Sequence, residues 1–296
     1  MTTRPTPPPR EFGGLPPISN EESRLLQEVV EEYCGLSYGI GSPFFLQRRL
    51  GPRLAALGLS TFYDYYHYLR YDPAGARELE DAIERLTTHE TYLFREQYQL
   101  DAFVGEILPE LANRLGGSRR LTVWSAGCST GEEVYTIAML LREAPRLRGW
   151  SLRVVGSDIS RKVVARARRG CYGPSSFRTT SAQYQKAYFR DVEGGFEIRE
   201  DLRAMCSFGQ LNLLATDRYH VLGACDVIFC RNVLMYLAPA ARARIVEAFY
   251  DTLNPGGYLL LGHSESLLNV STRFDLVHLS NDLVYRRPLP PKTSDR

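Results

Sequence analysis

The sequence lacks the features that would assign it to several classes at once. It has no run of 18 apolar residues, so no membrane-spanning helix is expected. Neither charge dominates, because 36 basic residues face 34 acidic ones, which argues against a protein that coats nucleic acid. Its six cysteines form no C-x-x-C pair, and none has a histidine at zinc-finger spacing. We therefore expect six reduced thiols in a cytoplasmic protein, with no metal site and no nucleic-acid partner.

The chain has enough length and apolar content for a large core. Its 296 residues, 44% of them hydrophobic, suggest about two domains. Residues 1–18 contain six prolines and no apolar periodicity, so we expect a disordered tail there, and the proline-rich residues 288–296 have the same character. The N-terminus also lacks the apolar region of a secretory signal.

Helical patterns fill the first third of the chain. Ser19 and Glu22 form a capping-box pattern, and apolar residues at helical spacing follow them. Further helices are predicted over 44–57, with a break near Gly51-Pro52, and over 61–70, 76–86 and 96–115. No convincing strand interrupts them, so we predict an all-helical N-terminal domain over residues 19–90.

From Leu121 onward, apolar strands alternate with helical segments. The clear strands are predicted at 121–125, 152–158, 224–233 and 258–262. Such alternation indicates βαβ units and a parallel sheet with right-handed crossovers. We predict an α/β domain over residues 91–287, with a small antiparallel insertion at 188–209.

Polar residues follow four of these strands, and ligands bind at the carboxyl ends of strands in an open parallel sheet. The turn Gly127–Gly131 allows close approach of a ligand, although it also fits an ordinary strand-to-helix turn. Asp158 suits ribose hydroxyls or the N-cap of the next helix. Asn212 suits an adenine edge or a turn. Arg231 and Asn232 have no packing reason to end an apolar strand.

These strand ends favour a nucleoside that lacks a pyrophosphate. The turn lacks the G-x-G-x-x-G pattern, and Glu132 and Glu133 after it would repel phosphate at a helix N-terminus. Both acids also have a simpler role, because acids in a first helical turn favour the helix dipole by roughly 0.3–1 kcal/mol. A cationic nucleoside such as S-adenosylmethionine fits better, and Leu253-Asn-Pro-Gly-Gly257 is typical of class I methyltransferases.

Five motifs make the sequence recognisable. They are Thr91-Tyr-Leu-Phe-Arg95-Glu, Trp124-Ser-Ala-Gly-Cys-Ser-Thr-Gly-Glu-Glu133, Ser157-Asp158-Ile, Phe229-Cys-Arg231-Asn232-Val-Leu-Met-Tyr236 and Leu261-Gly-His-Ser-Glu265. In this order, and behind a helical domain, they resemble the CheR family of chemotaxis-receptor glutamate methyltransferases over about residues 19–286. The resemblance implies a Rossmann-like class I S-adenosylmethionine-dependent methyltransferase domain of α/β fold, with a small antiparallel β insertion, behind an all-α domain.

The resemblance also implies an activity. A methyl group passes from S-adenosylmethionine to glutamate side chains in the cytoplasmic domain of membrane chemoreceptors, which gives glutamate methyl esters and S-adenosylhomocysteine. Cofactor contacts are implied at Thr91, Arg95, Glu133, Asp158, Asn212, Leu213, Arg231 and Asn232, and we add Gly127 from the turn. Two positions stay open. Some family members have Asn where this chain has His89, so a cofactor contact at His89 stays open. Glu132 is the alternative cofactor contact to Glu133 if the alignment of this pair is shifted by one residue.

The implied reaction needs no general base, because a glutamate with a pKa near 4.3 is already ionised at neutral pH. We expect proximity, orientation and partial desolvation to provide most of the catalysis of this in-line displacement. Arg95 is a candidate catalytic residue that suits either the substrate carboxylate or the methionine carboxylate. Tyr236 is the second candidate and would shape the methyl site, unless it is a core aromatic. His263 fits a positioning role.

Docking of the substrate has a separate signal. Arg48, Arg49 and Arg53 cluster on the second predicted helix, which suits acidic receptor helices or, alternatively, a solvated helix face. Some family members bind a C-terminal pentapeptide of the receptor by strand addition to the insertion. The hairpin at 190–196 looks short for that purpose, so pentapeptide binding is not expected.

Two other functions stay open at this point. The first is a methyltransferase of the same fold that acts on another signalling protein. The second is a catalytically silent module that binds the cofactor, and the intact set of polar strand-end residues argues against it. An RNA methyltransferase is disfavoured by the near-neutral net charge.

Overall fold

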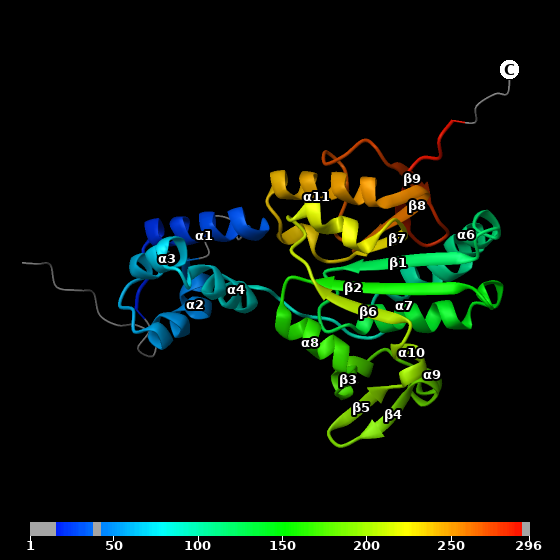
Figure 1. The fold of residues 1–296 in the computed structure, drawn as a ribbon, viewed down its shortest axis with the longest axis horizontal. Helices are drawn as coiled ribbons and strands as arrows, with labels where there is room; N and C mark the ends of the chain where they lie inside the picture. Colours follow the sequence, from blue (N-terminus) through cyan, green and yellow to red (C-terminus); the bar gives the residue numbers. More distant parts are fainter. Residues whose placement is uncertain (1–15, 38–42, 292–296) are drawn as a thin grey trace, which may run out of the picture. The chain divides into compact units, whose positions relative to one another are not determined.

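The computed structural model describes residues 16–37 and 43–291, and the chain divides into two compact units between Thr88 and His89 (Figure 1). This boundary lies two residues before the end of the helical domain expected at residue 90. Of the two expected tails, residues 1–15 and 292–296 lie outside the described residues.

The described part of the first unit contains four helices. These are α1 (Asn20–Cys34), α2 (Pro43–Leu57), α3 (Phe62–Tyr71) and α4 (Gly75–Leu86). The predicted capping box forms, because the Ser19 hydroxyl accepts the amide of Glu22 at 3.2 Å while the Glu22 carboxylate accepts the amide of Ser19 at 2.8 Å. The predicted break in the second helix is wrong, since α2 continues through Pro52.

One buried carboxylate connects three of these helices. Glu78 of α4 is only 5% exposed and accepts hydrogen bonds from Arg53 of α2, with 2.8 Å between Nε and Oε1, and from the Tyr65 hydroxyl of α3 at 2.7 Å. Asp81 lies 3.6 Å from the same guanidinium. Arg53 therefore turns into the unit. Its grouping with Arg48 and Arg49 as a docking surface is corrected, because its charge is already paired.

The second unit is built on a seven-stranded sheet of order β6-β2-β1-β7-β8-β10-β9 (Figure 1). The strands are β1 (Arg120–Ala126), β2 (Ser151–Asp158), β6 (Cys206–Gln210), β7 (Cys225–Cys230), β8 (Leu253–Leu261), β9 (Asp275–His278) and β10 (Leu283–Arg286). Neighbours from β6 to β8 are parallel, whereas β10 is antiparallel to β8 and to β9. The prediction of an α/β domain is confirmed.

Helices flank this sheet and its loops. They are α5 (Gln97–Ala102), α6 (Leu108–Arg114), α7 (Glu132–Glu143), α8 (Arg161–Arg169), α9 (Ala182–Tyr188), α10 (Glu200–Arg203) and α11 (Pro239–Thr252). Short 3-10 turns lie at Pro145–Leu147, Pro174–Phe177, Thr216–Leu222 and Leu234–Tyr236.

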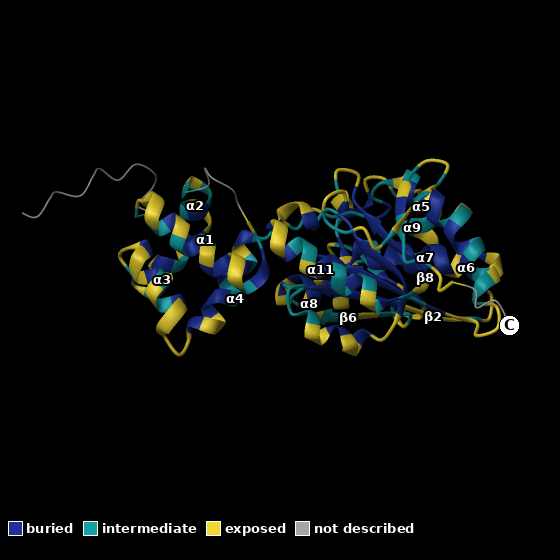
Figure 2. Cartoon of the chain, turned by 90° about the horizontal axis from the view of Figure 1, so that it is seen from above, coloured by how far each residue is buried: buried dark blue, intermediate teal, exposed yellow. Residues whose placement is uncertain are grey.

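The central strands are buried on both faces, as Figure 2 shows. Trp124 of β1 is fully buried, and its ring packs edge-on against Phe249 of α11 with 5.3 Å between the ring centres. Its indole N–H donates to the Ser157 hydroxyl at 2.9 Å, so the one polar atom of this large side chain is satisfied. The strand order reverses at β1, and the carboxyl ends of strands around such a point form the usual ligand site.

The helix predicted over 96–115 is interrupted by a π-turn at Phe103–Ile107. Pro109 has no N–H to donate to the carbonyl four residues earlier, so the α-helical ladder lacks one hydrogen bond at this position. The amide of Leu108 bonds instead to the carbonyl of Phe103, five residues back, and α6 starts there.

The antiparallel insertion expected at 188–209 is partly wrong. Its sheet consists of β3 (Cys171–Tyr172), β5 (Gly195–Ile198) and β4 (Phe189–Val192) in that order. Residues 206–210 instead form β6, which pairs in parallel with β2 in the main sheet. Phe208 of β6 packs against Tyr135 of α7 with 5.4 Å between the ring centres, and this contact favours the main sheet over the hairpin.

The cysteines, the helix lengths and the possible metal ligands can each be examined in the described residues. All six cysteines are free thiols, and burial raises the pKa of Cys34 to about 12. None of the helices within residues 16–37 and 43–291 combines the length and apolar character that crossing a membrane requires. In the same ranges, no group of three His, Cys, Asp or Glu side chains is arranged to hold a metal ion.

The Glu78 network gives a stability test. Glu78→Gln should lower the free energy of unfolding by about 1.5–3 kcal/mol, because hydrogen bonds to a charged group contribute on that order. Urea unfolding of the full chain measures it. Asp81→Asn is the control, since this half-exposed carboxylate also faces Arg53 but should contribute at most about 1 kcal/mol. Equal losses in the two variants would contradict the assignment of Glu78 as the central group.

Candidate functional site

The turn after β1 is fastened to the end of β2. The amides of Gly127 and Cys128 both donate to the carbonyl of Ser157, at 2.8 and 2.9 Å. Gly127 has φ +81°, and a Cβ at this position would come within 2.5 Å of Val233 in the loop after β7. Glycine is therefore required, because the turn is confined between two neighbouring strand ends.

Asp158 joins the same two loops through its carboxylate. Its Oδ2 accepts the amide of Ser129 at 2.8 Å, and its Oδ1 accepts the amide of Ser160 at 3.0 Å. Asp158 is not the N-cap of α8, since Ser160 has that role and accepts the amide of Val163 at 3.2 Å. The carboxylate is thus held at the end of β2 and faces the turn after β1.

A buried arginine organises the centre of the site. The side chain of Arg231, only 2% exposed, lies 3.0 Å from Glu133 and 3.1 Å from Glu96, and it donates to the carbonyl of Arg95 at 2.7 Å. Burial alone would lower the pKa of Arg231, but the two carboxylates outweigh it and the pKa is raised. Arg95 Nε also lies 4.0 Å from Glu96, so the two guanidinium groups balance the two carboxylates of the cluster. Glu133 is the carboxylate of this cluster that suits a cationic ligand.

The two adjacent glutamates of α7 have different environments. Glu133 accepts the hydroxyl of Ser125 at 2.7 Å in addition to the guanidinium of Arg231. Glu132 is buried away from this cluster and accepts the hydroxyls of Thr130 at 2.6 Å and Ser176 at 2.9 Å. Of the two, only Glu133 belongs to the strand-end cluster, which favours it as the cofactor contact.

The segment before α5 has an unusual backbone. Phe94 and Glu96 have φ of 58° and 56°, in the left-handed region that non-glycine residues rarely adopt. The amide of Phe94 donates to the hydroxyl of Thr136 at 3.1 Å, and the guanidinium of Arg95 donates to the carbonyl of Glu90 at 2.8 Å. Strain of this kind persists where the surroundings fix it, often at functional sites.

The strand ends contain buried polar atoms that fit a polar ligand. Ser129 Oγ, Arg231 Nε and Asn232 Oδ1 are buried without a hydrogen-bond partner among the described residues. Each unsatisfied atom costs about 1–3 kcal/mol, so such groups usually have a partner when a protein is at work. A ligand that carries hydroxyls, a carboxylate and an ammonium offers the partners that these atoms need.

The other predicted site residues lie less centrally. The Asn212 side chain accepts the amide of Leu214 at 3.0 Å, so its turn-forming role is realised, and the carbonyl of Leu213 accepts the hydroxyl of Tyr219 at 2.7 Å. Tyr236 is 42% exposed, so its alternative as a core aromatic is wrong. His89 and Thr91 are half-buried.

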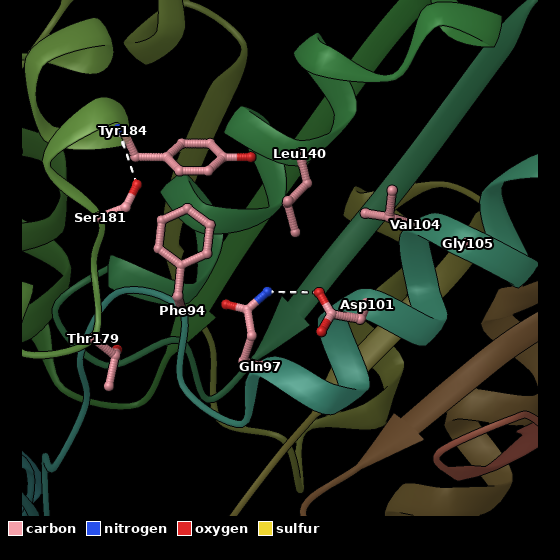
Figure 3. A pocket seen from close by; sticks show the side chains of 9 residues that line it. All are labelled: Phe94, Gln97, Asp101, Val104, Gly105, Leu140, Thr179, Ser181 and Tyr184. Carbon is pink, nitrogen blue, oxygen red and sulfur yellow. Dashed lines mark hydrogen bonds between the residues drawn. The ribbon is translucent and has the colours of Figure 1, made fainter.

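A separate pocket of about 350 Å³ lies beside the 91–96 segment (Figure 3). Phe94 and Tyr184 line it with their rings 4.5 Å apart, and Gln97 donates to Asp101 across its floor at 2.8 Å. None of its lining residues is a predicted cofactor contact. The predicted cofactor contacts therefore all lie outside this pocket.

Comparison with known proteins gives consistent matches over most of the chain. Residues 89–283 match the SAM binding domain of CheR methyltransferases, and residues 21–87 match their all-alpha domain. The chain belongs to the CheR methyltransferase family. It is an S-adenosylmethionine-dependent methyltransferase, with the class I fold behind an all-α domain.

Three relatives show how far this similarity extends. Chemotaxis protein methyltransferase 2 of Vibrio cholerae is 34% identical over 281 residues, which cover 94% of this chain and 97% of that protein. Chemotaxis protein methyltransferase of Klebsiella aerogenes is 36% identical over 264 residues, 88% of each chain. Chemotaxis protein methyltransferase 1 of Pseudomonas aeruginosa is 31% identical over 275 residues, 90% of this chain and 98% of that one.

Sequence reasoning assigned no role to two carboxylates of this methyltransferase. Glu96 completes the ion pairs of Arg231, and Glu265 binds the backbone of the loop after β7. Both residues end motifs that were used for recognition, so a signal was present in the sequence. Arg231 lies 135 positions from Glu96, and Asn232 and Val233 lie 33 and 32 positions from Glu265, so no local pattern reveals these contacts.

The glutamate pair of α7 can be separated by binding. Glu133→Gln should weaken the affinity for S-adenosylhomocysteine about tenfold or more, because a lost charge-assisted hydrogen bond costs about 1.5–3 kcal/mol. Glu132→Gln should lower the melting temperature and leave the affinity within about threefold. Titration calorimetry and thermal unfolding measure the two quantities. The opposite order of affinities would assign the cofactor contact to Glu132.

Proposed function

We propose that this methyltransferase transfers methyl groups from S-adenosylmethionine to glutamate side chains of membrane chemoreceptors. The products would be glutamate methyl esters on the receptor's cytoplasmic domain, formed in the cytoplasm during chemotaxis adaptation. The observation that carries the proposal is the Arg231–Glu133 ion pair at the strand ends of a chain whose two units match both CheR domains. The names of the three relatives support a chemotaxis substrate.

The proposed cofactor contacts follow from the strand ends. S-adenosylmethionine supplies an electrophilic methyl group on a sulfonium sulfur when it is bound. Glu133 suits its ammonium, Asp158 suits its ribose hydroxyls, and Arg231 acts by holding Glu133 in place. The full proposed set is His89, Thr91, Arg95, Gly127, Glu133, Asp158, Asn212, Leu213, Arg231 and Asn232.

The chain's part in the chemistry is orientation and exclusion of water. The acceptor carboxylate is already charged at neutral pH, so no side chain has to remove a proton. Arg95 has a 27% exposed side chain at the rim of the cluster, where its guanidinium can bind an incoming carboxylate with two parallel bonds. Tyr236, also exposed, is the proposed side wall of the methyl site.

Arg95 can be tested against a closely matched arginine. Arg95 and Arg178 both lie over the ring of Tyr92, with 5.9 and 3.7 Å from the guanidinium carbon to the ring centre. Arg178 also binds the side chain of Glu90 at 3.0 Å. Arg95→Ala should lower kcat/KM for a receptor by about 10- to 100-fold, as expected for a lost charged hydrogen bond. Arg178→Ala should stay within about twofold.

The assay measures transfer of a labelled methyl group onto purified receptor cytoplasmic domains. Base hydrolyses the methyl ester, and the label is then counted as methanol. An unchanged rate for Arg95→Ala would remove Arg95 from the site. If the wild-type protein binds S-adenosylhomocysteine but gives no base-labile ester on any receptor, the proposed substrate is wrong. A different signalling protein would then have to be sought.

We also propose that the receptor docks on α2. Arg48 and Arg49 are exposed and line a hollow of about 620 Å³ together with Phe44, Phe45, Arg85 and one carboxylate, Glu84. A surface that is both basic and apolar suits a helix rich in glutamate. The strands β4 and β5 of the insertion have only four residues each, so we do not expect binding of the receptor pentapeptide.

Charge reversal tests this surface. Arg48→Glu should raise KM for the receptor about fivefold, because about 1 kcal/mol of attraction is lost at the contact, with kcat and cofactor affinity unchanged. Higher salt should reduce the difference. The control is Arg77→Glu on the exposed face of α4. Equal effects of both variants would contradict a specific dock, and a pentapeptide complex in calorimetry would direct attention to the insertion.

A further inference from the structure

Glu265 binds four backbone amides with one carboxylate. Its Oε2 accepts the amides of Asn232 at 2.7 Å and Gly262 at 2.8 Å, while its Oε1 accepts those of Val233 at 2.9 Å and Met235 at 3.0 Å. Three of these amides belong to the loop after β7, and the fourth belongs to the loop after β8. One side chain therefore fastens two neighbouring strand-end loops to each other.

The loop after β7 needs this anion. Asn232 has φ +58°, a left-handed conformation that most residues with a side chain avoid and that asparagine adopts more readily. The turn directs several N–H groups toward one point, and such a concave arrangement of amides binds an anion. The two oxygens of a carboxylate accept all four amides, and the negative charge of the carboxylate strengthens each hydrogen bond. A neutral side chain cannot supply that charge.

The packing around this contact leaves no spare room. A Cβ at Gly262 would lie 2.7 Å from Asn232 Nδ2, 2.8 Å from its amide nitrogen and 2.9 Å from Glu265 Oε2. The loop after β7 also touches the turn after β1, because Val233 fills the space that a side chain at Gly127 would take. The loop that Glu265 binds therefore packs directly against the turn after β1.

The bound amides lie inside the segment that carries the proposed site residues. Arg231 immediately precedes them, and Tyr236 immediately follows them, with its own amide bonded to the carbonyl of Val233 at 3.1 Å. We propose that Glu265 is a positioning residue of this methyltransferase. It holds residues 231–236 so that Arg231 meets Glu133 and Asn232 keeps its left-handed backbone.

Two variants test the charge and the reach of this side chain. Glu265→Gln keeps the shape but replaces one oxygen by an NH₂ group, which cannot accept the two amides bound there. We expect affinity for S-adenosylhomocysteine to fall about tenfold and kcat about 100-fold, with receptor KM within about twofold. Glu265→Asp keeps the charge with a shorter stem and should recover part of both losses.

A matched control separates positioning from general stability. Glu106 also accepts a loop amide, that of Ser280 at 2.9 Å between β9 and β10. Glu106→Gln should leave cofactor affinity and kcat within about twofold. All variants are compared at a temperature where circular dichroism shows them fully folded. If Glu265→Gln does not fold, the cofactor affinity and kcat of Glu265→Asp are compared with those of the wild-type protein instead, and wild-type values for both would contradict the proposal.

The proposal is overturned if folded Glu265→Gln keeps wild-type affinity and turnover, or if Glu106→Gln loses as much. It is also overturned if only receptor KM changes, since that pattern belongs to docking. Cofactor affinity is measured without a receptor, whereas the measurement of kcat needs a receptor substrate and so rests on the proposed function. A failure of the proposed substrate would therefore leave the affinity test of Glu265 intact.

Discussion

The strand-end site depends on a single buried cation. Arg231 can be buried only because Glu96, Glu133 and the carbonyl of Arg95 surround its guanidinium. Removing one partner would leave an uncompensated charge in the interior, which typically costs about 3–5 kcal/mol. The partners come from the 91–96 segment and from α7, while Arg231 itself follows β7. This ion cluster therefore determines how three distant parts of the chain meet.

The nearly balanced composition of the chain hides a separation of charge. At the strand ends, the carboxylates of Glu133 and Asp158 lie on neighbouring loops, whereas on α2 the exposed Arg48 and Arg49 share a hollow with a single carboxylate, Glu84. The first arrangement suits a cation and the second suits an anion. Opposite local charges in one chain fit a reaction between a cationic methyl donor and an anionic acceptor.

Much of this arrangement could be predicted from sequence, because period and composition are local properties. Asp158 and Arg231 can be recognised as candidate site residues from sequence, because a polar residue that ends an apolar strand has no packing role. The pairing of β6 with β2 is harder to predict because residues 206–210 carry only two apolar side chains, Cys206 and Phe208, and none of the five is buried. The pairing of Arg53 with Glu78 joins residues 25 positions apart, and such contacts depend on the tertiary fold.

Carboxylates that bind backbone give the site its rigidity. Asp158 fastens the turn after β1 to the start of α8, Glu265 fastens the loop after β7 to that after β8, and Val233 against Gly127 connects the two pairs. A displacement at a sulfonium methyl gains little from acid–base groups and much from fixed geometry. Loops that are fastened before the cofactor arrives lose less entropy on binding, so these contacts favour the chemistry that the proposed function requires.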